Sequence, residues 1–145
     1  DEATRDAFTE SGWFRTGDRV CQDRTGRFRY VERAKDMLKV GGENVAAAEV
    51  ERVVATVPGV REVAVVAAPD RMLGEVPVAF VLVGPAQDEG RVVSAVEAMC
   101  ARMLADFKRP RRIVLVDELP RSTLNKVAKA QLRARLADGV EAPAR

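Results

Sequence analysis

The chain has 145 residues, of which 47% are hydrophobic and 32% charged, and this balance predicts one packed domain with an appendage. It contains no histidine, which excludes Ser-His and Cys-His nucleophiles and argues against a transition-metal site. A net charge of +2 without interleaved aromatics does not indicate nucleic-acid binding, and no apolar run reaches the roughly 18 residues of a membrane span.

The N-terminal part predicts a β-hairpin. Residues 1–10 are polar and weakly helical, and residues 13–20 and 26–32 have the composition of strands. Residues 23–26 join them with turn residues, including a glycine. The two cysteines, Cys21 and Cys100, form no Cys-x-x-Cys motif, and no signal-peptide pattern opens the chain. Both observations favour a reducing, cytoplasmic location.

The rest of the chain predicts an α+β fold, in which helices pack on a three-stranded sheet. A small hairpin turns at Gly41 and Gly42, flanked by residues 37–40 and 44–45. Glu49 and Glu51 are expected on the solvent face of the helix that follows. The predicted strands are residues 60–68, 76–83 and 112–116, and the predicted helices are residues 47–56, 90–107 and 127–136.

Three motifs occur in order along the chain: GWFRTGD at residues 12–18, ERAKD at 32–36 with GGENV at 41–45, and LPRSTLNKV at 119–127. In these motifs the chain resembles the AMP-forming acyl-CoA synthetases of the adenylate-forming superfamily, which includes luciferases and peptide-synthetase adenylation domains. The resemblance implies that residues 1–33 are a remnant of a large N-terminal domain and residues 34–145 a C-terminal lid domain. It covers most of the chain.

The resemblance implies an ATP-dependent, AMP-forming acyl-CoA ligase, which adenylates a carboxylic acid and then transfers the acyl group to CoA. The expected cofactors are ATP/AMP, CoA and Mg²⁺, the last bound mainly by the large N-terminal domain. Two alternatives stay open: an enzyme that loads a carrier protein, and a stand-alone binding domain of the same fold. The fragment alone is expected to be inactive, and the acid is not identifiable from it.

Lys126 is the expected catalytic residue, because the family places its adenylation lysine at this position of the third motif. The residue before it is usually glycine, but is Asn125 here, and asparagine tolerates left-handed backbone geometry. The alternative is an ordinary surface lysine. The motif is no Walker A loop, since the required glycines are missing.

The resemblance assigns further roles by position. Asp18 and Arg33 are expected to contact the nucleotide, and Lys35 is expected to be the hinge of domain rotation. Gly41 and Gly42 are expected to line the pantetheine channel of CoA, although a plain hairpin turn is the alternative. The role of Lys39 stays open, since many acyl-CoA ligases lack a lysine there.

Two surfaces carry weaker expectations. The basic cluster Lys108, Arg109, Arg111 and Arg112 is interpreted as a solvated surface in preference to a CoA-phosphate site. The hairpin bears four aromatic residues whose large-domain partner is missing, so residues 10–32 are expected to pack against a neighbouring molecule or fold back onto the lid. Any such self-association would result from truncation.

Overall fold

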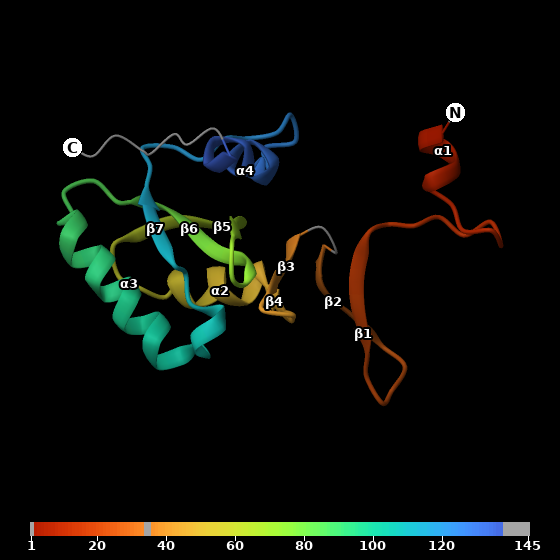
Figure 1. The fold of residues 1–145 in the computed structure, drawn as a ribbon, viewed down its shortest axis with the longest axis horizontal. Helices are drawn as coiled ribbons and strands as arrows, with labels where there is room; N and C mark the ends of the chain where they lie inside the picture. The colour runs from red at the N-terminus through yellow and green to blue at the C-terminus, as the bar shows by residue number, and fades with distance from the viewer. Residues whose placement is uncertain (1, 34–35, 138–145) are drawn as a thin grey trace. The chain divides into compact units, whose positions relative to one another are not determined.

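The structure is a computed structural model that describes residues 2–33 and 36–137 (Figure 1). It divides into two compact units, Asp1–Met37 and Leu38–Arg145. Within the described residues, none of the helices has the length and apolar character needed to cross a membrane.

The first unit contains a short helix, α1 (Glu2–Asp6), and a hairpin of β1 (Asp18–Gln22) and β2 (Phe28–Arg33). Strand β1 was expected from residue 13, but begins at Asp18. The preceding residues form a turn of their own, in which the Trp13 amide donates to Thr9 Oγ1 at 2.9 Å and Phe8 forms a β-bridge to Phe14.

Apolar side chains on this hairpin and in the turn before it are exposed, with Phe28 at 71% and Trp13 at 76% of their full exposure. The same holds for Phe14, Val20 and Tyr30. Burying one such side chain is worth roughly 1.5–3 kcal/mol. The hairpin therefore presents an apolar surface for which a partner would be favourable, and its self-association stays a prediction.

The second unit has a five-stranded sheet where three strands were predicted. The long hairpin of β5 (Val60–Asp70) and β6 (Gly74–Val83) forms its centre, and β7 (Arg112–Leu115) runs parallel to β6. The small hairpin of β3 (Met37–Val40) and β4 (Glu43–Ala46) is also part of the sheet. It joins the sheet because Val40 pairs with Gly74 at the start of β6.

Three helices cover the sheet. Figure 1 shows α2 (Ala47–Val54) and α3 (Glu89–Met103) on one side and α4 (Lys129–Ala137) on the other. Helix α3 is shorter than predicted, because Leu104 is extended, with φ −119° and ψ 143°. A 3₁₀ turn, Asp106–Lys108, follows this break.

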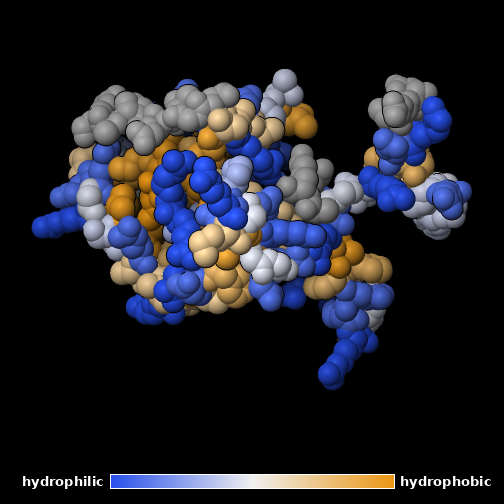
Figure 2. Space-filling model, in the orientation of Figure 1, coloured by the Kyte–Doolittle hydropathy of each residue, from blue (hydrophilic) through white to orange (hydrophobic). Residues whose placement is uncertain are grey.

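Alternate residues of β6 enter two separate hydrophobic cores, as the two-residue period of a strand requires. Ala79 and Val81 belong to the first core, with α2 and α3, whereas Val78 and Phe80 belong to the second, with α4. Hydrophilic residues cover much of the visible outer face (Figure 2). The predicted α+β class is thus confirmed, with helices on both faces of the sheet.

Candidate functional site

Lys126 lies in a tight hairpin formed by residues 120–128, here called the Lys126 hairpin. The amide of Ser122 donates to the carbonyl of Lys126 at 2.7 Å, and the amide of Ala128 donates to that of Pro120 at 2.7 Å. Asn125 closes the turn with φ 58°, in the left-handed region. A left-handed residue at the third loop position is typical of this hairpin class, so the expectation for Asn125 is confirmed.

The Lys126 side chain is exposed, while its backbone is fixed. Its amide donates to Ser122 Oγ at 3.3 Å. Within residues 2–33 and 36–137, no ion pair engages the Lys126 ammonium. These hydrogen bonds hold the Lys126 backbone in a defined turn. The result is a cation available to an external anion from an ordered support.

Four charged residues that the sequence analysis did not assign to the site hold this hairpin. Arg121 forms an ion pair with Glu62 of β5. Lys129 forms one with Glu51 of α2, with Nζ to Oε1 at 2.7 Å. Glu51 was expected to face solvent, but its side chain is only 22% exposed, because it accepts from both Lys129 and the Val65 amide.

Gly41 and Gly42 form the turn between β3 and β4, here called the glycine hairpin. Their φ angles are +57° and +88°, which L side chains rarely adopt. The Gly41 amide donates to the Leu73 carbonyl at 2.8 Å. A Cβ on Gly41 would lie 3.2 Å from Leu73 Cδ2, whereas one on Gly42 would meet nothing within 4 Å.

The turn that supports the glycine hairpin is itself held by Asp70. Its Oδ1 accepts from the amides of Met72 and Leu73, each at 2.8 Å. These hydrogen bonds hold the pKa of Asp70 below its ordinary value, and the one from the Leu73 amide has the larger effect. Lys39 is exposed, and its amide donates to Glu75 Oε2 at 2.7 Å.

The two expected nucleotide contacts are neighbours in the first unit. Asp18 at the start of β1 pairs with Arg33 at the end of β2, so the backbones of these residues lie opposite one another. Asp18 is half-buried, and its amide donates to Thr16 Oγ1 at 3.1 Å. The expected hinge residue, Lys35, lies outside the described residues.

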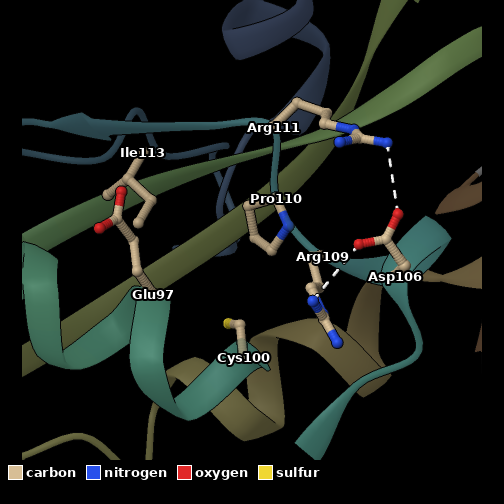
Figure 3. A pocket seen from close by; sticks show the side chains of 7 residues that line it. All are labelled: Glu97, Cys100, Asp106, Arg109, Pro110, Arg111 and Ile113. Carbon is tan, nitrogen blue, oxygen red and sulfur yellow. Dashed lines mark hydrogen bonds and ion pairs between the residues drawn. The ribbon is translucent and has the colours of Figure 1, made fainter. Parts of the chain in front are cut away.

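The predicted basic cluster is bound largely by the protein's own acceptors (Figure 3). Asp106 forms ion pairs with Arg109 and Arg111, and Arg109 also donates to the carbonyls of Leu104 and Ala101. Lys108 forms an ion pair with Glu49 at 2.8 Å, so Glu49 does not simply face solvent as expected. These contacts make the cluster in part a connection between α3 and β7.

The cavity beside this cluster has a volume of about 190 Å³, below the roughly 300 Å³ of small ligand pockets. Cys100 lines it, and burial raises the pKa of its thiol. A neutral thiol is a poor nucleophile. No trio of potential metal ligands occurs in the described part of the chain. We therefore place the candidate site on the two hairpins.

The two hairpins rest on different cores. The strands of the glycine hairpin supply Leu38, Val40 and Val45 to the first core. The Lys126 hairpin and the segments beside it supply Leu119, Val127 and Leu132 to the second. Because these cores lie on opposite faces of the sheet, the second unit presents two separate candidate surfaces.

The chain is similar to known proteins in both sequence and structure. Residues 49–126 match the family described as AMP-binding enzyme C-terminal domain. The chain is 44% identical over 132 residues to long-chain-fatty-acid–CoA ligase FadD13 of Mycobacterium tuberculosis, covering 91% of the chain and 25% of that protein. It is 44% identical over 134 residues to triostin synthetase I of Streptomyces triostinicus, covering 92% of the chain and 25% of that protein.

A solved structure gives the same result. The chain superposes on ATP-bound MatB from Rhodopseudomonas palustris with a TM-score of 0.82 and 36% identity, covering 94% of the chain and 27% of MatB. The chain thus spans about a quarter of the length of the relatives it matches. The predicted family resemblance is confirmed.

Proposed function

The chain belongs to the AMP-binding enzyme C-terminal domain family, and from that premise we propose that it is the lid of an AMP-forming acyl-CoA ligase. The whole enzyme adenylates a carboxylic acid with ATP and then passes the acyl group to CoA. The observation that carries the proposal is the exposed Lys126 on an ordered hairpin, separated from the glycine hairpin by the sheet.

Lys126 serves the first half-reaction. In adenylation a carboxylate oxygen attacks the α-phosphate of ATP and pyrophosphate leaves. Negative charge gathers around the α-phosphate in the transition state, and a fixed cation stabilises that charge. The ammonium meets this need because no carboxylate of the described chain neutralises it. The nucleotide's ribose and phosphates are contacted by Asp18 and Arg33, which the first hairpin brings opposite each other.

The glycine hairpin serves the second half-reaction. Backbone without side chains at Gly41 and Gly42 lets a thin ligand, the pantetheine arm of CoA, approach closely. Lys126 and the glycine hairpin rest on opposite cores, so presenting each in turn requires the lid to rotate. The pivot is Lys35.

The rest of the proposal concerns the whole enzyme. Residues 1–33 are part of a large N-terminal domain, which holds the carboxylic acid and most ligands of Mg²⁺, and residues 34–145 are the lid. Contacts with the rest of that domain would cover the exposed aromatic side chains of β2, Phe28 and Tyr30. A carrier protein's phosphopantetheine in place of CoA is the second candidate, since triostin synthetase I is among the similar proteins. A cytoplasmic location stays a prediction.

The test is Lys126→Ala in the full-length enzyme. Adenylate formation, measured by pyrophosphate exchange, should fall on the order of 10²–10³-fold, as for loss of one transition-state contact. Thioester formation from supplied acyl-adenylate should be nearly unchanged, because Lys126 has turned away by then. Arg91→Ala removes another exposed cation, whose side chain is 89% exposed, and is the matched control.

Equal losses in both half-reactions would contradict this division of roles. Supplying CoA or a phosphopantetheinylated carrier protein to the wild-type enzyme separates the two acceptors. A full-length enzyme that forms no acyl-adenylate would overturn the proposal and favour a binding domain.

A further inference from the structure

Arg121 connects the Lys126 hairpin to the sheet. One end of its guanidinium, Nη2, forms an ion pair with Glu62, which lies on β5 and is 59 positions away in sequence. The other end, Nη1, donates to the carbonyl of Asn125 at 3.4 Å. A planar guanidinium suits such a bridge, because its donors are fixed in direction. Arg121 therefore joins a sheet residue to the residue that precedes Lys126.

This contact reaches the part of the turn that sets the direction of Lys126. Asn125 is left-handed at φ 58°, and its carbonyl is the last acceptor before Lys126. Arg121 also forms an antiparallel β-bridge with Val127, so these two residues pair across the hairpin, on either side of its turn. A change in the orientation of Asn125 is transmitted to Lys126 through a single peptide bond.

A second ion pair holds the base of the hairpin. Lys129 and Glu51 are 18% and 22% exposed, so this pair is shielded from water. Glu51 Oε1 also accepts from the Val65 amide at 2.8 Å, on the free edge of β5. The base is thus fixed independently of Arg121. At the turn itself, the Arg121–Glu62 pair adds a side-chain restraint to the backbone hydrogen bond between the Ser122 amide and the Lys126 carbonyl.

We propose that Arg121 and Glu62 are positioning residues for Lys126 in the adenylation step. The inference rests on the proposed function of Lys126. Electrostatic stabilisation requires the cation to be in place before the charge develops, and a displacement of about 1 Å can cost on the order of 10²-fold in rate. The pair acts through the Asn125 carbonyl and does not touch the substrate.

The test uses Arg121→Gln and Glu62→Gln in the full-length enzyme. Each should lower kcat for adenylation between about 10-fold and 100-fold, with KM for ATP little changed and with thioester formation from supplied acyl-adenylate unchanged. Arg121→Lys should recover only part of the loss, because an ammonium cannot bridge both acceptors as a guanidinium does. Arg91→Gln, which removes an ion-paired arginine on α3, is the control and should leave both steps unchanged.

Two double variants separate positioning from simple stability. Arg121→Gln with Glu62→Gln should be no slower than either single variant, because the two residues act as one unit. Arg121→Gln added to Lys126→Ala should have no further effect on adenylation, because Arg121 acts only through Lys126. A persistent loss in that background would overturn the inference.

The outcomes also separate this inference from the proposed function. If Lys126→Ala slows adenylation and Arg121→Gln does not, the positioning role is wrong and the proposed function stands. If Lys126→Ala has no effect on adenylation, the assigned role of Lys126 fails, and the inference fails with it.

Discussion

The Lys126 hairpin and the glycine hairpin both present candidate site residues at a turn, but different contacts support them. Charged side chains from α2 and β5 hold the first, through Glu51 and Glu62. Backbone hydrogen bonding holds the second, through the Gly41 amide and the Leu73 carbonyl at 2.8 Å. Both turns are held by backbone hydrogen bonds, but ion pairs also support the Lys126 hairpin, whereas the glycine hairpin needs positive φ at two positions without side chains.

The difference matches the role that we propose for each surface. A cation must be held at a defined point, and an arginine bridge can fix that point without neutralising the lysine. A channel for a thin ligand needs open space, which only glycine supplies at φ +88° without strain. The same sheet therefore supports one site built from side chains and another built from bare backbone.

The largest expected effect within this comparison comes from adding one methyl group to the glycine hairpin. Gly41→Ala should lower the free energy of unfolding by about 1–2 kcal/mol, the cost of a left-handed non-glycine residue, and its Cβ would also press on Leu73 Cδ2 at 3.2 Å. Urea unfolding measures the change. The thioester step should slow, and adenylation should not.

Gly90→Ala is the matched control, because Gly90 lies in α3 and its φ is not positive. Its stability should be unchanged or raised by about 0.5–1 kcal/mol. A loss for Gly90→Ala as large as that for Gly41→Ala would show that backbone conformation is not what holds the glycine hairpin.

A smaller effect should come from salt. Raising the ionic strength from about 0.1 M to 1 M shortens the Debye length from about 10 Å to 3 Å and weakens partly exposed ion pairs. Hydrogen exchange should show less protection of the Ser122 amide, by under about 1 kcal/mol, and no change at the Gly41 amide. Combining Arg121→Gln with Glu62→Gln should remove most of the salt dependence at Ser122; equal dependence at both amides would contradict the comparison.

The smallest effect should come from acid, at the turn beneath the glycine hairpin. The pKa of Asp70 is lowered by its hydrogen bonds to the Leu73 and Met72 amides. Its stabilising contribution is therefore complete above its ordinary pKa, 3.8, and is lost as the pH falls through the lower folded value. Protection of the Gly41 amide, corrected for intrinsic exchange, should fall in that range. Asp70→Asn keeps an acceptor oxygen, does not titrate, and should abolish the pH dependence.

Local signals predicted the second unit well. Runs of β-branched apolar residues predicted β5 and β6, helical spacing predicted the helices, and glycine predicted the turn between β3 and β4. The left-handed conformation of Asn125 also followed from residue type. Each of these features depends on residues that are near in sequence.

Contacts between distant residues were not predictable in the same way. Arg121 and Glu62 meet only because the segment after β7 returns to β5. The spacing of residues along the sequence does not predict this contact. Glu51 was expected to face solvent from its position on the helix, yet its carboxylate accepts a hydrogen bond from the Val65 amide at the free edge of β5. Phe107 continued the apolar spacing of α3 beyond the actual helix end, because it packs on the first core after the chain has turned.

The second core has a consequence for how the protein is made. Leu132 of α4 completes a core that otherwise consists largely of β5 and β6 residues, among them Val66 and Phe80. During synthesis these strands leave the ribosome well before α4, so one face of the sheet stays uncovered until the last helix arrives. A chain that stops before α4 lacks this cover and exposes apolar strands that favour aggregation. A chain that lacks α4 therefore cannot complete its second core. A chain that completes this core also contains the Lys126 hairpin, because residues 120–128 precede α4.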